Sequence, residues 1–196
     1  MVKKVRQYAR IFAEKEPGAE KNAGAENLSE PENSGNKTSL VVVLEDLRSL
    51  HNVGAIFRTA DGAGFGKVIC CGITAVPPRP QIAKVSLGAE DYVAYQFYPL
   101  ITEALFALKA QGYAIVSLEK NETSRSLFEA LQEGSIGKPL ALVLGNEVAG
   151  VSAEALHLSD AVCHLSMRGM KESLNVSVAF GAASYLIAEM LSVSEK

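Results

Sequence analysis

The stretch Leu140-Ala141-Leu142-Val143-Leu144-Gly145-Asn146-Glu147 passes from five apolar residues to a glycine and then to two polar residues. A short apolar run that ends at a glycine is typical of a buried strand. Glycine directly after such a strand permits a tight turn and exposes peptide groups to a ligand. The stretch therefore predicts a strand at 140–144 and, after it, a loop that can hold a ligand.

Similar short runs rich in β-branched or aromatic residues lie on both sides of this stretch and alternate with helical patterns. The other predicted strands cover 40–44, 67–72, 92–97, 113–118 and 161–166. The predicted helices cover 53–63, 101–111, 126–132, 152–156 and 173 to about 191. This alternation predicts an α/β fold with a mostly parallel, six-stranded sheet and helices on both faces.

Two further polar segments begin predicted helices, and ligands of open parallel sheets bind beyond the carboxyl ends of the strands. Asn52 precedes the first helix and Ser173 precedes the last, and both residue types are good helix N-caps. Gly54 and Arg58 share a helix face, so the missing side chain at Gly54 is expected to leave room for an approach to Arg58. An arginine there can hold a phosphate through two parallel hydrogen bonds, although a solvated arginine beside a capped helix is the simpler interpretation.

The N-terminal residues differ in composition from the rest of the chain. Residues 1–12 hold four basic side chains and no acidic ones, whereas residues 13–36 are rich in Gly, Ala, Asn and Ser and hold few large apolar groups. Such a segment cannot bury enough surface to offset the entropy lost on ordering. We expect a basic arm and disordered linker over 1–39 and one globular domain over 40–196. The arm is either an RNA contact or a solvated terminus.

Composition limits the class of protein. A net charge of -3 argues against a surface that is basic overall, so any contact with nucleic acid must be local. Three cysteines and no apolar leader predict a reducing, cytoplasmic location. The apolar residues at 174–191 are interrupted by polar ones, which favours a buried helix over a membrane span.

Two familiar ligand motifs do not fit. The glycine cluster at 62–66 closes a predicted helix, whereas a dinucleotide fingerprint must open one, so the cluster is interpreted as a C-cap and turn. Cys163 and His164 are adjacent on a predicted strand and point to opposite faces, which argues against a metal site with His157. We expect no metal.

Three segments together resemble the SpoU, or TrmH, family of RNA ribose 2'-O-methyltransferases of the SPOUT superfamily. They cover 52–60, 142–150 and 170–179, with a supporting segment at 84–89, and the resemblance extends over about 40–191. It implies that residues 40–196 are the catalytic domain and that the C-terminal part forms a deep trefoil knot, although knots are rare. It also implies S-adenosyl-L-methionine as cofactor. A homodimer is implied in which one subunit's first segment completes the partner's site.

The resemblance also implies roles for individual residues. The cofactor contacts would come from Leu144, Gly145, Asn146, Glu147, Leu165, Ser166, Met167, Ser173, Leu174 and Asn175. The catalytic set would be Arg58, which acts on the reacting ribose, and Asn52, Glu147, Ser173 and Asn175, which position it. RNA contacts would include Arg58, Lys84 and Arg168. A guanidinium has a pKa above ~12, which favours a clamp for phosphate and developing alkoxide over a general base at Arg58.

The RNA substrate is expected to be tRNA rather than rRNA. Family members with a separate RNA-binding domain place it before the catalytic domain, and residues 1–39 are too short and too polar to form one. Two other classes stay open: a catalytically idle RNA-binding protein of the same fold, and a small module that binds a nucleotide such as NAD. The missing dinucleotide fingerprint argues against the second.

Overall fold

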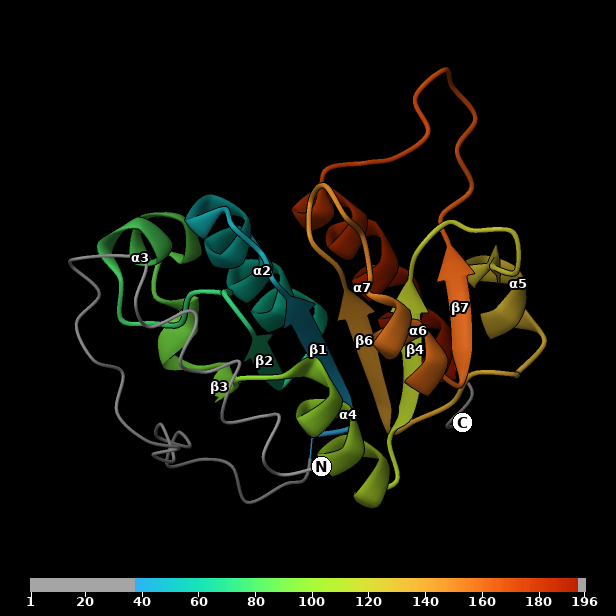
Figure 1. The fold of residues 1–196 in the computed structure, drawn as a ribbon, viewed down its shortest axis with the longest axis horizontal. Coiled ribbons are helices and arrows are strands. Elements are labelled where there is room, and N and C mark those ends of the chain that lie inside the picture. Colours follow the sequence, from blue (N-terminus) through green and yellow to red (C-terminus); the bar gives the residue numbers. More distant parts are fainter. Residues whose placement is uncertain (1–37, 194–196) are drawn as a thin grey trace.

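A single parallel sheet forms the centre of the computed structural model, which describes residues 38–193 of the chain (Figure 1). The strands are β1 (Leu40–Glu45), β2 (Lys67–Cys71), β3 (Ala94–Tyr98), β4 (Ala114–Leu118), β5 (Arg125–Ser126), β6 (Leu140–Leu144) and β7 (Ala161–His164). Their order is β3-β2-β1-β6-β4-β7-β5, and every neighbouring pair is parallel. The predicted arm at 1–12 and most of the predicted linker lie outside the described residues.

The predicted number of six strands is wrong, because the sheet has seven. The additional strand, β5, is two residues long and pairs Arg125 with Cys163 and Ser126 with His164 of β7. A strand of two residues is too short to produce the alternating pattern that identifies strands in a sequence.

Helices cover both faces of the sheet, as predicted (Figure 1). They are α2 (Leu50–Ala63), α3 (Pro80–Ser86), the 3₁₀ helix η1 (Ala89–Asp91), α4 (Ile101–Ala110), α5 (Leu127–Gln132), α6 (Ala153–Leu158) and α7 (Val176–Val193). Each predicted helix is present with shifted ends, whereas α3 and η1 were not predicted. None of the helices in the described part of the chain is long and apolar enough to cross a membrane.

Alternation along the strands produces two apolar cores. In β1, Val42 and Leu44 face the core formed with α2, α5 and α7, whereas Val41 and Val43 face the core formed with α4 and α6. All four side chains are fully buried. Each burial contributes about 1.5–3 kcal/mol relative to exposure, so the sheet is stabilised from both sides.

Helix α2 begins earlier than predicted, and its cap is a different residue. Ser49 is the N-cap, and its Oγ accepts a hydrogen bond from the Asn52 backbone N–H at 3.2 Å. The prediction that Asn52 caps this helix is therefore wrong. Asn52 lies inside the first turn, where its buried side chain is available to other segments. At the other end, Gly64 adopts φ 74°, which confirms the predicted glycine C-cap.

The last helix also has an unexpected cap. Helix α7 begins at Val176, and residues 165–175 form a loop before it. The Asn175 carbonyl accepts from the Ala179 N–H at 2.8 Å, and Asn175 Oδ1 accepts from the Ser177 N–H at 3.0 Å. Asn175 thus satisfies amides that would otherwise lack partners, and the prediction of Ser173 as the cap is wrong.

The missing side chain at Gly54 lets α3 pack closely against α2, and it does not provide the expected approach to Arg58. A Cβ built on this buried residue would lie 2.7 Å from the carbonyl oxygen of Ile82 and 2.9 Å from Cβ of Val85, both in α3. Helix α3 therefore occupies the space that was expected to lead to Arg58.

Gly54→Ala should lower the free energy of unfolding by about 1–3 kcal/mol, because the new methyl group would push α3 away from α2. Chemical denaturation of both proteins measures this. Gly137→Ala is the matched control, since a Cβ there meets no atom within 4 Å. Equal stability of the Gly54→Ala variant and the parent would show that the two helices separate at little cost.

Candidate functional site

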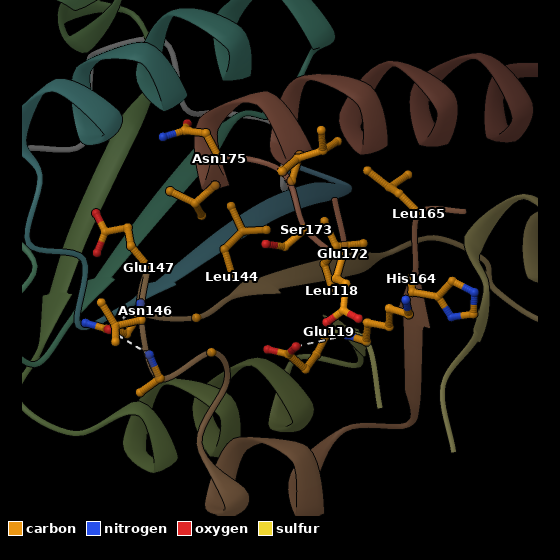
Figure 2. Close-up of a pocket in the computed structure, with 18 of the residues that line it drawn as sticks. Leu118, Glu119, Leu144, Asn146, Glu147, His164, Leu165, Glu172, Ser173 and Asn175 are labelled. Atoms are coloured by element: carbon orange, nitrogen blue, oxygen red, sulfur yellow. Dashed lines mark hydrogen bonds between the residues drawn. The ribbon is translucent and has the colours of Figure 1, made fainter. Parts of the chain in front are cut away.

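A cavity of about 470 Å³ lies at the carboxyl ends of β4, β6 and β7, beside the first turn of α7 (Figure 2). Its lining residues are Leu118, Glu119, Lys120, Leu144, Gly145, Asn146, Glu147, Val148, Ala149, Gly150, His164, Leu165, Met167, Glu172, Ser173, Leu174, Asn175, Val176 and Ala179. Figure 2 shows Glu147 at one side and His164 at the other, with Leu144 between them. The volume lies within the usual range for small-molecule sites, and the position is the one that parallel sheets use for ligands.

The lining combines apolar walls with a negative charge. Leucine side chains at the ends of β4 and β6 and leucine and methionine side chains of the 165–175 loop supply the apolar surface. The charged side chains are those of Glu119, Glu147, Glu172 and Lys120. With three carboxylates against one ammonium group, the cavity suits a ligand that is apolar over part of its surface and carries positive charge.

The loop after β6 is folded tightly on itself. Asn146 and Gly150 exchange backbone hydrogen bonds of 3.0 and 2.9 Å. Asn146 Oδ1 accepts from the N–H groups of Val148 and Ala149, while its Nδ2 donates to the Asp46 carbonyl at 2.6 Å. A Cβ at Gly145 would lie only 2.1 Å from the carbonyl carbon of Gly150. The loop can close in this way only because residue 145 is glycine.

A chain of side-chain hydrogen bonds joins the three sequence segments. Asn52 Nδ2 donates to Glu147 Oε1 at 3.0 Å, and Asn175 Nδ2 donates to Asn52 Oδ1 at 3.3 Å. Asn52 lies in α2, Glu147 in the loop after β6, and Asn175 at the start of α7. The resemblance implied that the first segment completes the partner's site, whereas Asn52 here contacts Glu147 and Asn175 of its own chain.

Glu147 is held as a carboxylate. The backbone N–H groups of Arg48 and Ser49 donate to it at 3.2 and 3.1 Å, in addition to Asn52. Partial burial would raise the pKa of Glu147, but these hydrogen bonds and one from its own backbone N–H hold the pKa below its usual value. A carboxylate whose oxygens already accept these bonds is a weak base, so the geometry makes Glu147 an anchor for the start of α2.

Glu147→Gln should lower the free energy of unfolding by about 1 kcal/mol near pH 7, comparable with the loss of a helix cap. Because the folded-state pKa is depressed, the carboxylate's contribution is complete above its unfolded pKa of about 4.3 and is lost as pH falls through the folded pKa. Urea denaturation between pH 3 and 7 should show the two proteins converging at low pH. Glu122→Gln, an exposed loop substitution, is the control. A gap that stays constant with pH would contradict the role of ionised Glu147.

Arg58 and Lys84 do not line this cavity. They lie at a separate, more open cavity of about 730 Å³, whose other lining residues are Leu50, His51, Gln81, Val85 and Leu87. Both side chains are exposed, as is Arg168 in the loop before α7. Within one chain, therefore, Asn52 of the first segment joins the main cavity through its contacts, whereas Arg58 does not.

Of the ten predicted cofactor residues, nine line the main cavity, and Ser166 is outside the lining. The sequence interpretation missed Glu119, Lys120, His164 and Glu172. Glu119 and Lys120 directly follow a strand that was correctly predicted, so the rule that ligands bind at carboxyl ends could have identified them. Within residues 38–193, no group of three His, Cys, Asp or Glu side chains is arranged to hold a metal ion.

Comparison with known proteins places this chain in one family. The model of the SpoU rRNA Methylase family matches residues 39–185. The tRNA (guanosine(18)-2'-O)-methyltransferase of Thermus thermophilus is 36% identical over 143 residues, which are 71% of this chain and 69% of that protein. The 23S rRNA (guanosine-2'-O-)-methyltransferase RlmB of a Burkholderia species is 36% identical over 142 residues, 72% of this chain and 56% of the relative. The matched part of the chain thus spans 69% of the first relative and 56% of the second.

Solved structures of SpoU methyltransferases have the same fold as this chain. The TrmH/SpoU tRNA modifying enzyme of A. aeolicus has a TM-score of 0.71 and 28% identity, covering 81% of this chain and 78% of that one. AviRb from Streptomyces viridochromogenes, described as a SpoU methyltransferase in complex with the cofactor AdoMet, has a TM-score of 0.71 at 24% identity, covering 81% and 62%. On the family match over most of its length, this chain belongs to the SpoU family of RNA methylases.

Proposed function

We propose that this protein transfers a methyl group from S-adenosyl-L-methionine to a ribose 2'-hydroxyl of RNA. The observation that carries the proposal is the cavity at the ends of β4, β6 and β7, built from the segments that the family resemblance assigned to the cofactor. The methyl donor carries a sulfonium and an ammonium group against a single carboxylate. Its positive charge and its apolar adenine both fit a cavity with three carboxylates, one lysine and leucine walls.

The cofactor would supply an electrophilic methyl group, so the protein's residues have to bind, align and exclude water. The folded loop after Gly145 presents backbone groups to the adenine, with Leu144, Leu165 and Leu174 as apolar walls. Asn175 and Glu147 hold the start of α7 and the start of α2 at a fixed spacing through Asn52. The rigid frame favours one orientation of the donor.

The acceptor side is proposed to come from a second subunit. Arg58 lies outside the cavity of its own chain, and its guanidinium is exposed. In a homodimer, Arg58 of one subunit would reach the cavity of the other and hold an RNA phosphate and the developing alkoxide. Lys84 beside it would add a phosphate contact, and Arg168 would add another from the loop before α7.

An apolar face on α7 supports the dimer. Val178 and Tyr185 are 54% and 51% exposed, and they lie two turns apart on the same side of the helix. Exposed apolar side chains in register on one helix are typical of a contact surface. Gel filtration with light scattering should give about twice the mass of the 20.8 kDa chain.

The C-terminal part is proposed to form the trefoil knot of the family. Strand β7 lies near one edge of the sheet, beyond β6 and β4. Helix α7, which follows β7, nevertheless packs against α2, the helix that connects β1 to β2 in the other half of the sheet. This crossing of residues 165–175 supports the proposal. Residues 1–39 are proposed to remain a separate arm and linker before the catalytic domain.

The proposed substrate is tRNA, with rRNA as the second choice, in the cytoplasm. Relatives of both kinds are 36% identical to this chain, but the share of the relative that is covered is larger for the tRNA enzyme, 69% against 56%. Guanosine 18 is the position in that relative's name, so it is the first nucleotide to examine. Mapping 2'-O-methyl marks in cells with and without the protein would identify the nucleotide.

Calorimetry and a methylation assay test the function together. The protein should bind S-adenosyl-L-methionine and ignore NAD, and it should transfer labelled methyl groups to unmodified tRNA. A preference for NAD would contradict the proposal, while cofactor binding without transfer to tRNA or rRNA would favour the idle RNA-binding alternative.

A further inference from the structure

Glu119 is one of the cavity residues whose role neither the sequence segments nor the family comparison defines. It directly follows β4, and its backbone N–H donates to the Cys163 carbonyl at 2.8 Å. This hydrogen bond fixes the Glu119 backbone beside β7. Figure 2 shows its carboxylate directed toward the loop after β6. The Val151 N–H donates to Oε2 and the Lys120 N–H to Oε1, each at 2.9 Å. The carboxylate is thus held at both oxygens.

These two bonds leave acceptor capacity on each oxygen. An ionised carboxylate offers about four lone-pair sites, two on each oxygen, and the backbone occupies one per oxygen. The two remaining sites belong to the two oxygens of one carboxyl group. Such a pair of acceptors matches two neighbouring hydroxyl donors, which is the arrangement of the 2'- and 3'-hydroxyls of a ribose.

The other carboxylates of the cavity fit this role less well. Glu147 already accepts from Arg48, Ser49 and Asn52. Glu172 is exposed in the loop before α7, and no hydrogen bond from the described residues fixes its carboxylate. An acidic residue at the carboxyl end of a parallel strand is also a recurring partner of ribose hydroxyls in nucleotide sites of other α/β folds.

We propose that Glu119 binds the ribose diol of the methyl donor. Each carboxylate oxygen accepts a hydrogen bond from one of the two hydroxyl groups. The inference rests on the proposed function, since it assumes that an adenosyl group occupies the cavity. Glu119 thereby sets specificity for a ribose over a deoxyribose, and the Val151 and Lys120 amides orient it.

Calorimetry with two probes tests the inference: S-adenosyl-L-homocysteine and its 2',3'-dideoxy analogue. The parent protein should prefer the first by about 10- to 100-fold, because two hydrogen bonds to a charged group are lost with the diol. In Glu119→Ala and Glu119→Gln the preference should fall to within about threefold. A role confined to holding the 145–151 loop would weaken both probes equally and leave the ratio unchanged.

Glu172→Gln is the matched control, since it removes the same charge from the same cavity. Its affinity for both probes should fall together while the ratio is retained. A parent ratio near one, or an unchanged ratio in both Glu119 variants, would overturn the inference and leave the proposed function standing. If the parent bound neither S-adenosyl-L-homocysteine nor S-adenosyl-L-methionine, the proposed function itself would fail.

Discussion

Gly145→Ala should weaken the binding of S-adenosyl-L-homocysteine by roughly 30- to 100-fold while the protein stays folded. The new Cβ would lie 2.1 Å from the Gly150 carbonyl carbon and 2.2 Å from the Val151 nitrogen. Both are backbone atoms, so the 145–151 loop must move as a unit, and the strain corresponds to about 2–3 kcal/mol. Because the loop forms the wall of the cavity, the loss appears mainly in ligand affinity.

Calorimetry measures the affinity, and circular dichroism checks the fold. Gly169→Ala provides a control in the loop before α7, since a Cβ there meets nothing within 4 Å. It should change affinity by less than about threefold. Unaltered binding in the Gly145→Ala variant would mean that the loop after β6 is not where the cofactor lies.

Arg58→Ala should lower turnover on tRNA by about 10²- to 10³-fold, as expected when a group that stabilises transition-state charge is removed. The affinity for S-adenosyl-L-homocysteine should stay within about twofold, because Arg58 lies outside the cavity of its own chain. Arg58→Lys should recover little activity, since an ammonium group cannot form two parallel bonds. Nearly full turnover in Arg58→Lys would rule out the bidentate clamp.

Mixing two impaired variants, at an S-adenosyl-L-methionine concentration too low to fill the Gly145→Ala cavity, tests whether Arg58 acts across the dimer. Subunits with Arg58→Ala keep an intact cofactor cavity, and subunits with Gly145→Ala keep the arginine. If each site combines groups from two subunits, random exchange should restore about a quarter of the parental turnover, because half the dimers then hold one complete site. If Arg58 acts within its own chain, no exchange will restore activity.

Most strands and helices of the fold could be predicted from the sequence, but two short elements, β5 and α3, could not. Apolar runs such as 140–144 are long enough to define strands, and β6 has the bounds that were predicted for it. The two-residue β5 leaves no such signal. Helix α3 does carry a local signal in the sequence, because Pro80 stands at its first position, where proline favours a helix start. Its seven residues are too few for periodicity to reveal it.

Residue types identified much of the site, whereas the partners of those residues required the fold. Gly145 was predicted to permit a tight turn, and it does. The sequence placed Asn52 and Ser173 at helix starts, where local hydrogen bonds would explain them, but Ser49 and Asn175 fill those positions. What the Asn52 side chain contacts depends on residues about a hundred positions away in the chain, and no local pattern encodes such a contact.

The chain of bonds from Glu147 through Asn52 to Asn175 has a consequence for how this protein can change over evolutionary time. Loss of any one side chain leaves a donor or acceptor of its neighbour without a partner, in or beside a buried position. The three substitutions are therefore energetically coupled, and a tolerated replacement at one site requires a compensating replacement at the next. Related sequences should consequently keep or exchange these three residues as a set, even though nearly a hundred positions separate the first from the second.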